Sequence, residues 1–340
     1  MWFLNKLLLG MTFDVRYSWK KRNMQNTKLQ MVLPKLRDYL DLMRISNVFT
    51  AMADVVMGFL FAQSVGWHWT RWDLWTLLTL VAASSALYTA GMTLNDVFDA
   101  ELDGRERPER PIPSGRMPFD AAQRLGWRLL FWGVMLGAGT VFFTGHLRAG
   151  VTAAVLAVMI VLYDAWLKRT PLGPAAMGAC RTLNIMLGMT AVDAPLHGED
   201  WLVAGGIGVY IAGVTWFARR ESQRSGRVQL TLSLLVMLSG IGILAQLPRY
   251  SNRLVELLQK EPQRWYMLTG VLGLLIAWRC FRAVMDPISP RVRAAVAHCI
   301  LSLVMLDAIC CFSVRGVAWA CLIFAFFLPT VLLGRWIKMT

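Results

Sequence analysis

Apolar stretches of about 20 residues, the length that spans the hydrocarbon core of a bilayer, recur along this chain of 340 residues. Backbone polar groups inside lipid must satisfy their own hydrogen bonds, so stretches of this kind form helices. The strands of a membrane barrel would alternate in polarity, and these stretches do not alternate. Because hydrophobic residues make up 56% of the sequence, an ordinary soluble domain is excluded and a helical membrane protein is predicted.

Ten apolar segments are candidates for the helices of one membrane domain. They lie at 46–65, 74–94, 122–145, 149–166, 175–192, 201–218, 229–247, 265–284, 294–313 and 316–336. The sequence therefore predicts an all-α, multi-pass bundle of nine core helices plus a tenth C-terminal helix. A count of nine stays open, because one segment could be re-entrant or interfacial.

The distribution of charge predicts how this bundle is oriented. A net charge of +14 would suggest nucleic acid in a soluble protein, whereas short cytoplasmic loops of membrane proteins collect Lys and Arg. The first 45 residues hold nine basic residues against three aspartates, which places the N-terminus in the cytoplasm. We therefore predict no nucleic-acid partner, a location in the inner or plasma membrane, a cytoplasmic or interfacial segment at 1–45 and a transmembrane domain at 46–338.

One loop fits this orientation poorly. The segment 248–264 is placed outside the cell by the helix count, yet it carries Arg249, Arg253, Lys260 and Arg264. The other basic loops all fall on the cytoplasmic side, so the predicted orientation stands with this exception.

An acidic stretch, "TLNDVFDAELDGRERPERPIPSG", follows the second apolar segment. Asp96, Asp99 and Asp103 stand at i, i+3 and i+7, which places them on one stripe of a helix, with Asn95 beside the stripe and Glu101 pointing away. Three carboxylates on one stripe repel each other unless a cation lies among them. Oxygen ligands without nearby His or Cys suit a hard ion such as Mg²⁺, which usually completes its coordination with phosphate oxygens and water.

The residues after the acids predict a stiff, cationic loop. Three prolines, at 108, 111 and 113, prevent the helix from continuing. Guanidinium groups can pair with the acids or bind a diphosphate through two parallel hydrogen bonds. The arginines of this loop are Arg105, Arg107, Arg110 and Arg116.

This pattern resembles the first signature of the UbiA superfamily of intramembrane prenyltransferases. The match, N-D-x-x-D-x-x-x-D followed by R-P-x-R-P-I-P-S-G, covers Asn95 to Gly115 almost without a break. Weaker similarity extends to "LMRISN" at 42–47, to "YDAWLKR" at 163–169 and to "GPAAMGACRTLNIMLG" at 173–188. Within the superfamily, "ARRE" at 218–221 together with "GACRTLN" at 178–184 most resembles the EboC branch, which is associated with bacterial operons for handling secondary metabolites.

The resemblance implies transfer of a prenyl group from a prenyl diphosphate to a lipophilic or aromatic acceptor, with Mg²⁺ as cofactor. It also implies a central cavity that opens to the cytoplasmic face, where the active site lies. The expected partners are the prenyl diphosphate, the acceptor, membrane lipids and proteins of a metabolite-export operon. By motif matching, the metal ligands are Asp96, Asp99 and Asp103; the catalytic residues are Asp96, Asp99, Lys168 and Tyr163; and the substrate-binding residues are Asn95, Asp103, Arg44, Arg110, Arg181, Asn184, Arg220 and Glu221.

The sequence departs from the family after the sixth apolar segment. Typical members carry a second aspartate motif there, but residues 214–230 contain no aspartate, and Glu221 is their one acid. Three explanations stay open: Glu221 replaces the motif, the donor needs less metal, or the protein binds a prenyl lipid without transferring it. The alternative function is therefore a non-catalytic membrane component that binds or helps export a prenylated or aromatic metabolite.

Acids inside the apolar segments are further candidates. Asp54 and Asp307 lie within predicted spans, where an ionisable group is costly and is a functional candidate by default. The alternative for each is a hydrogen-bonded packing role. Asp164 lies near a helix end, and we expect it to pair with Lys168 or Arg169.

Overall fold

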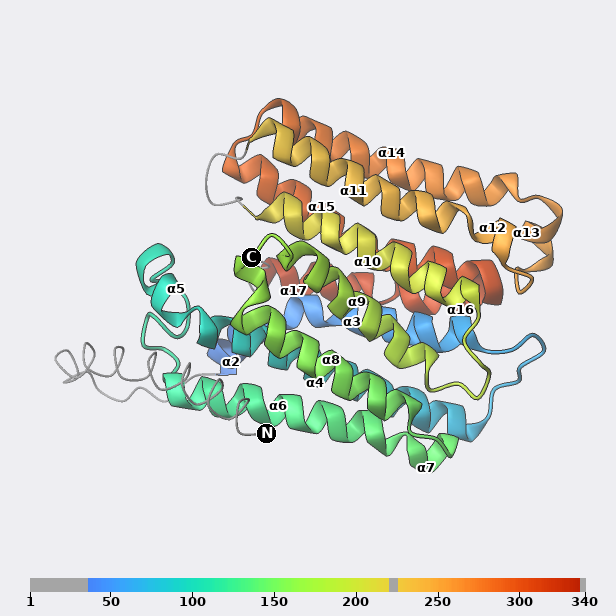
Figure 1. Ribbon diagram of the computed structural model, residues 1–340, viewed down its shortest axis with the longest axis horizontal. Coiled ribbons are helices and arrows are strands. Elements are labelled where there is room, and N and C mark those ends of the chain that lie inside the picture. Colours follow the sequence, from blue (N-terminus) through green and yellow to red (C-terminus); the bar gives the residue numbers. More distant parts are fainter. Residues whose placement is uncertain (1–35, 220–225, 337–340) are drawn as a thin grey trace.

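The computed structural model describes residues 36–219 and 226–336, and every regular element in these residues is a helix (Figure 1). The N-terminal segment at 1–35 lies outside the described residues, so most of the predicted segment 1–45 is not described.

The elements follow one another along the chain with short connections. They are α2 Leu36–Leu42, α3 Ile45–Ala62, α4 Arg71–Phe98, α5 Ala100–Glu106, α6 Phe119–Gly139, α7 Val141–Thr144, α8 Arg148–Ala165, the 3₁₀ turn η1 Leu167–Arg169, α9 Gly173–Met189, α10 Gly198–Ala218, α11 Arg227–Ala245, α12 Leu247–Tyr250, α13 Glu256–Lys260, α14 Gln263–Met285, α15 Ser289–Arg315, α16 Val317–Phe324 and α17 Phe327–Trp336.

Membrane-length helices confirm the predicted fold class. Nine helical segments of the described chain are long and apolar enough to cross a bilayer. The predicted segment without a place among these nine is 175–192, which corresponds to α9; its 17 residues are one fewer than the shortest of the nine. The final predicted helix is interrupted at Ala325–Phe326, between α16 and α17.

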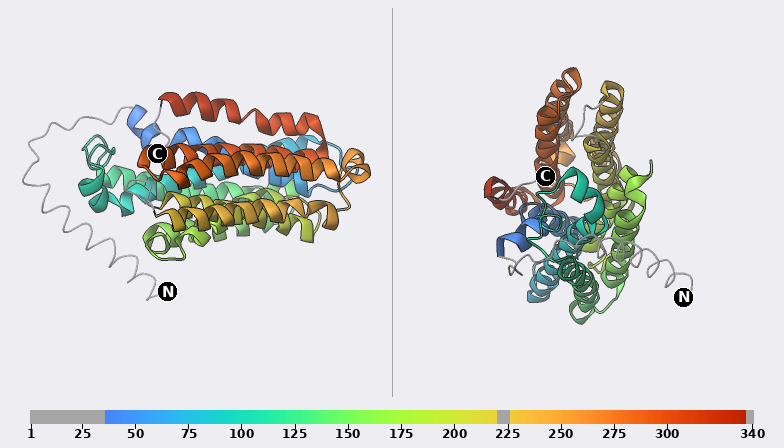
Figure 2. Two further views of the ribbon diagram at one scale, coloured as in Figure 1. Left: turned by 90° about the horizontal axis from the view of Figure 1, so that it is seen from above. Right: turned by 90° about the vertical axis from the view of Figure 1, so that its left-hand side faces the viewer.

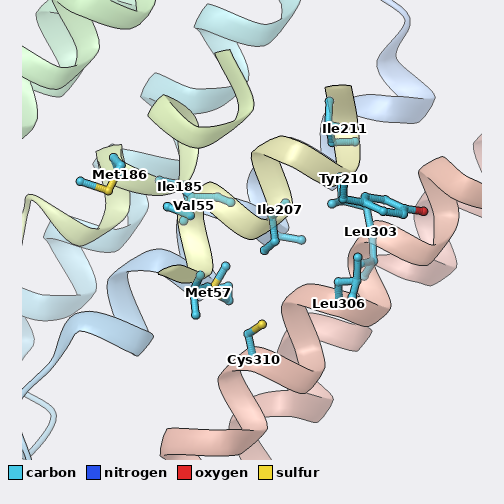
Figure 3. Packing of buried hydrophobic residues seen from close by; sticks show 14 of the residues in the cluster. Val55, Met57, Ile185, Met186, Ile207, Tyr210, Ile211, Leu303, Leu306 and Cys310 are labelled. Atoms are coloured by element: carbon cyan, nitrogen blue, oxygen red, sulfur yellow. The ribbon is translucent and has the colours of Figure 1, made fainter. Parts of the chain in front are cut away.

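The long helices lie side by side in one bundle around α3 (Figures 1 and 2). In α3, 83% of the residues are buried, against 11% in the last span, Val317–Gly334. Figure 3 shows the core around α3, where apolar side chains of α9, α10 and α15 meet. On one side of this core the Tyr210 hydroxyl donates to the Cys299 carbonyl at 2.8 Å, which joins α10 to α15.

The motif-bearing segments gather at one end of the bundle, which we call the site end. The end of α4, α5, η1 and the starts of α3 and α9 lie there, and Figure 1 shows the end of α10 and the start of α11 at the same end. This arrangement follows from helices that alternate in direction, because every second connection then falls on the same side.

The opposite end explains why the basic loop at 248–264 fits the charge rule poorly. Arg253 forms ion pairs with Glu199 and with Asp200, the latter at 2.6 Å, and it also donates to the carbonyls of Phe61 and Ala62 at the end of α3. Lys260 and Arg264 pair with glutamates of their own loop. Most of the positive charge of this loop is therefore neutralised locally.

Replacing Arg253 with methionine should destabilise the protein by about 3 kcal/mol, because it leaves two buried carboxylates without their cation. The Glu199 and Asp200 side chains are 6% and 1% exposed, so water cannot compensate. Thermal unfolding in detergent measures the effect. Arg249→Met, at an exposed position of the same loop, is the matched control and should leave the melting temperature unchanged. Equal melting temperatures for the two variants would contradict the role of Arg253.

Candidate functional site

The acidic stretch forms a bend at the site end, not one straight helix. α4 ends at Phe98, α5 begins at Ala100, and Asp99 between them has φ −97° and ψ 3°. Arg110 lies between the two flanking carboxylates and donates to Asp103 at 2.6 Å and to Asp96 at 3.2 Å. Asp96 and Asp103 therefore share one cation, as their common stripe predicted.

Asp99 turns toward a different group of cations. The Lys168 ammonium donates to the Asp99 carboxylate at 2.7 Å and to the side-chain oxygen of Asn95 at 3.0 Å. Arg169 reaches the other Asp99 oxygen at 3.3 Å. The 3₁₀ turn η1 brings these two basic residues from the end of α8 to the end of α4. Asn95, Asp99 and Lys168, which the sequence predicted as one site, are therefore in direct contact.

Arg44 reaches the site from the break between α2 and α3. It has φ 47° and is the one non-glycine residue with positive φ among the described residues, a left-handed conformation that side chains disfavour. Its guanidinium donates to Asp96 at 3.2 Å. Burial alone would lower the pKa of Arg44, but the charges of Asp96 and Asp103 outweigh it and raise the pKa.

Burial also affects one of the acids. It raises the pKa of Asp103, while the contact with Arg110 opposes this rise. The contact with Arg110 is thus the main interaction that favours the charged form of Asp103.

A cavity of about 370 Å³ runs from these residues into the bundle. Its walls are apolar in the middle and polar at both ends. The lining includes the predicted site residues Arg44, Asn95, Asp99, Asp103, Arg110, Tyr163, Arg181 and Asn184, together with the apolar Leu87, Leu156, Ile160 and Met177. The sequence thus identified residues at both ends of one cavity.

A second, polar cleft of about 710 Å³ adjoins the cavity at the site end. Arg44, Arg107 and Arg110 line both hollows, and Asp96 faces the cleft. Arg116 holds the rim closed against α2 through ion pairs with Asp38 and Asp41. A charged group entering from the polar side would therefore meet arginines before it reaches the cavity.

Two predicted site residues lie outside the described residues, and the expected ion pair of Asp164 is not formed. Arg220 and Glu221 fall in the gap 220–225, so whether Glu221 replaces the missing aspartate motif stays open. Glu101 is exposed and pairs with Arg105, as expected. Asp164 does not form the expected ion pair with Lys168 or Arg169, because Asp99 binds both of these cations.

The predicted site residues did not include Tyr88 and Arg107. Tyr88 lines the cavity from α4, seven residues before Asn95 and therefore on nearly the same face of the helix, and this spacing was the available signal. Arg107 lines both hollows and has no ion pair among the described residues; its place in the arginine-rich loop was the available signal.

The oxygen ligands of the site suit Mg²⁺ without forming a finished metal centre. No three metal-binding side chains converge on one point in the described part of the chain. Asp96 and Asp99 instead point to different cations on either side of the bend. Since Mg²⁺ is usually bound through only one or two carboxylates plus phosphate oxygens and water, this donor set fits an ion that arrives with a diphosphate.

Comparison with known proteins gives one family. The sequence profile of the UbiA prenyltransferase family matches residues 51–291. Among curated relatives, the digeranylgeranylglyceryl phosphate synthase of Ignicoccus hospitalis is 33% identical over 166 residues, which are 48% of this chain and 50% of that protein. The synthase of Methanoregula boonei is 34% identical over 152 residues, 45% of this chain and 50% of that protein. The chain spans about half the length of the curated relatives it matches.

Solved structures share the fold of this chain, and some of them are named UbiA homologues. A UbiA homologue of Archaeoglobus fulgidus bound to GPP and Mg²⁺ matches with a TM-score of 0.60 and 11% identity over 85% of this chain and 99% of that chain. A structure described as digeranylgeranylglyceryl phosphate synthase in membranes matches with a TM-score of 0.57 and 18% identity over 87% of this chain and 98% of that chain. At these identities the likeness establishes the fold.

Proposed function

Because the chain belongs to the UbiA prenyltransferase family, we propose that it transfers a prenyl group from a prenyl diphosphate to a lipophilic or aromatic acceptor within the membrane. The observation that carries the proposal is the position of Lys168, in contact with Asn95 and Asp99 at the polar mouth of an apolar-walled cavity. The curated relatives are named as synthases of a prenylated glyceryl phosphate, and one structural neighbour binds GPP and Mg²⁺.

The basic side chains of the site can stabilise the leaving diphosphate. Ionisation of an allylic diphosphate leaves several negative charges on the departing oxygens, and fixed positive groups stabilise that developing charge. Arg110 lines the cavity and is held by Asp103, and Lys168 lies behind the lining residue Asp99, which it contacts at 2.7 Å. Arg107 also lines the cavity and is free of an ion pair among the described residues. The diphosphate would take over hydrogen bonds that these side chains now give to Asp96, Asp99 and Asp103.

The middle of the cavity suits the prenyl group. Leu87, Leu156, Ile160 and Met177 line it, so an allylic cation formed there would be shielded from water until the acceptor attacks. Tyr163, next to Asp164 at the end of α8, adds a polarisable ring to this wall near the mouth. A ring face of this kind attracts a cation.

Mg²⁺ would be held by Asp96 and Asp99. When bound, it would neutralise part of the negative charge of the diphosphate. Asp103 stays a predicted third ligand, although its bond to Arg110 favours a supporting role.

The charge distribution supports a cytoplasmic position for the site end. Arg44, Arg107, Arg169, Arg219 and Arg227 lie at this end, whereas the arginines and lysines of the loop 248–264 are largely paired with acids. By the positive-inside rule, the site and the N-terminus belong on the cytoplasmic side of an inner or plasma membrane.

The alternative, a non-catalytic component that binds a prenylated or aromatic metabolite, draws its support from the missing second aspartate motif at 214–230. Association with proteins of a metabolite-export operon belongs to this alternative. It differs from the enzyme in one measurable respect: binding of the metabolite would survive removal of metal.

Release of diphosphate tests the proposal directly. Purified protein in lipid nanodiscs, given labelled geranyl, farnesyl or geranylgeranyl diphosphate and a phenolic or alcoholic acceptor, should form prenylated product in the presence of Mg²⁺. Chelation with EDTA should stop the reaction, because the diphosphate charge is then left without its metal. Folded protein that binds prenyl compounds equally with and without EDTA, and forms no product with any donor, would establish the non-catalytic alternative instead.

A further inference from the structure

Asp164 is a buried acid in the cavity wall to which the predicted function assigns no role. Asp164 is 2% exposed and lines the cavity, and its Oδ2 atom has no hydrogen-bond partner. A buried carboxylate without a partner is costly in a membrane protein, and such groups usually mark a functional site. The arrangement therefore calls for a role for Asp164 in the cavity.

The basic residues that could have paired with Asp164 are committed elsewhere. Lys168 contacts Asp99 at 2.7 Å and Asn95 at 3.0 Å, and Arg169 contacts Asp99 at 3.3 Å. The Asp164 carboxyl consequently stays available to a molecule in the cavity.

The depth of Asp164 matches the position of the reacting carbon. Asp164 lies in the last turn of α8, just before the 3₁₀ turn η1 that carries Lys168 to the end of α4, so along the chain it lies on the bundle side of the residues that hold the diphosphate. The allylic carbon of a donor is attached to the diphosphate on the side of the apolar tail. A nucleophile that attacks this carbon would therefore arrive near the level of Asp164.

The deep end of the cavity limits the charge of the acceptor. Arg181 lines it and pairs with Asp54 at 2.6 Å, and the buried Asp307 carboxyl is an electrostatic neighbour of both. Asn184 also donates to Asp54, at 3.0 Å. Arg181 thus faces the carboxyls of Asp54 and Asp307, so an acceptor with a carboxylate would be repelled, whereas an uncharged polar group would find hydrogen-bond donors.

On the premise of the proposed prenyl transfer, we propose that Asp164 accepts the proton of an uncharged, hydroxyl-bearing acceptor. The C–O bond between the allylic carbon and the diphosphate breaks, and its electron pair leaves with the diphosphate. An acceptor lone pair forms the new bond to the allylic carbon, and the acceptor's proton passes to the Asp164 carboxylate. Atoms and charges balance without a further reactant.

Charged groups from other elements surround Asp164 and must be considered in any test. Lys168 and Arg44 supply positive charge, and Asp96 and Asp99 supply negative charge. Cys180 of α9 and the adjacent Tyr163 complete its titratable neighbours. Because these groups also act on the diphosphate site, donor affinity is measured separately, so that an effect on donor binding is distinguished from an effect on proton transfer.

The decisive quantity is the amount of prenylated product formed per diphosphate released. With geranyl diphosphate and 2-naphthol, Asp164→Asn should form product at least 100-fold more slowly, since a general base contributes about 10² to 10⁴ in rate. Diphosphate release into water should continue, so the ratio falls. 4-Nitrophenol assayed at pH 8, where most of it is the phenolate and needs no base, should recover the ratio in the variant, which also lacks the negative charge of Asp164.

Controls separate this role from a structural one. Binding of geranyl S-thiolodiphosphate, an unreactive donor analogue, should be unchanged in Asp164→Asn. Asp164→Glu should form more prenylated product per diphosphate released than Asp164→Asn does. Asp120→Asn, at an exposed acid of the same end, should behave as wild type. Wild-type protein should also prefer 2-naphthol over 6-hydroxy-2-naphthoate by at least tenfold in KM.

The outcomes are distinguishable. Wild-type transfer together with an unchanged product-to-diphosphate ratio in Asp164→Asn overturns the role of Asp164 and leaves the proposed function intact. A preference for the carboxylate-bearing naphthol overturns the assigned acceptor class. Folded wild-type protein that transfers nothing to any acceptor overturns the proposed function and this role with it.

Discussion

Asp99→Ala is expected to lower the rate of prenyl transfer by roughly 100- to 1000-fold, the range found when a fixed electrostatic contact to a transition state is removed. Asp99 holds Lys168 at 2.7 Å and Arg169 at 3.3 Å, and by motif it is also a ligand of Mg²⁺. Its loss therefore removes one metal ligand and releases the ammonium group that stabilises the leaving diphosphate.

The rate should be measured as Mg²⁺-dependent formation of prenylated product, together with the Mg²⁺ concentration that gives half the maximal rate. We expect this concentration to rise in Asp99→Asn, because an amide is a weaker ligand for Mg²⁺ than a carboxylate. Glu101→Ala, two residues along, is the matched control: its side chain is exposed and pairs with Arg105, so activity should be unchanged. A folded Asp99→Ala variant with wild-type turnover would rule out the assigned site.

The helices themselves could be predicted from the sequence, because each needs only a local run of apolar residues. Every predicted segment has a counterpart, including α9 and the two pieces α16 and α17. The break at Ala325–Phe326 was missed, although Pro329 was the available signal. Proline lacks the N–H that would bond to the carbonyl four residues earlier, here that of Ala325, and its ring clashes with that carbonyl, so the helix is interrupted there.

The sequence predicted which residues gather at the candidate site, but not which cation pairs with which carboxylate. The spacing of Asp96 and Asp103 placed them on one stripe, and Arg110 binds both. The same spacing placed Asp99 with them, but the bend after Phe98 turns Asp99 to Lys168 instead. The expected partner of Asp164 was wrong for the same reason: which cation meets which acid depends on backbone angles that are fixed by packing of distant segments.

The deep end of the cavity depends on how closely α3 and α9 approach each other. A Cβ added to Gly188 would meet the Val55 carbonyl oxygen and would lie 2.7 Å from the Phe59 backbone nitrogen. Gly58 on α3 faces the Ile185 carbonyl in the same way. Small residues of this kind allow the backbones of membrane helices to touch. Val55 and Ile185 lie at this contact (Figure 3).

Gly188→Val should therefore destabilise the protein by about 3 kcal/mol or more, because the added atoms collide with backbone that cannot move aside independently of its helix. Thermal unfolding and size-exclusion chromatography in detergent measure the loss of folded protein. Gly205→Val is the matched control, since a Cβ at that position in α10 has nothing within 4 Å. A wild-type melting temperature in Gly188→Val would mean that α3 and α9 are farther apart.

The milder Gly188→Ala connects this packing to function. Arg181 and Asn184 lie one to two turns before Gly188 on α9, and both contact Asp54, the residue before Val55 on α3. Moving α9 outward to admit one methyl group lengthens these contacts and changes the deep end of the cavity. We expect Gly188→Ala to raise the KM for the acceptor several-fold while donor affinity stays the same, since Asp99 and Lys168 lie on α4 and η1. Equal losses for donor and acceptor would instead indicate general unfolding of the bundle.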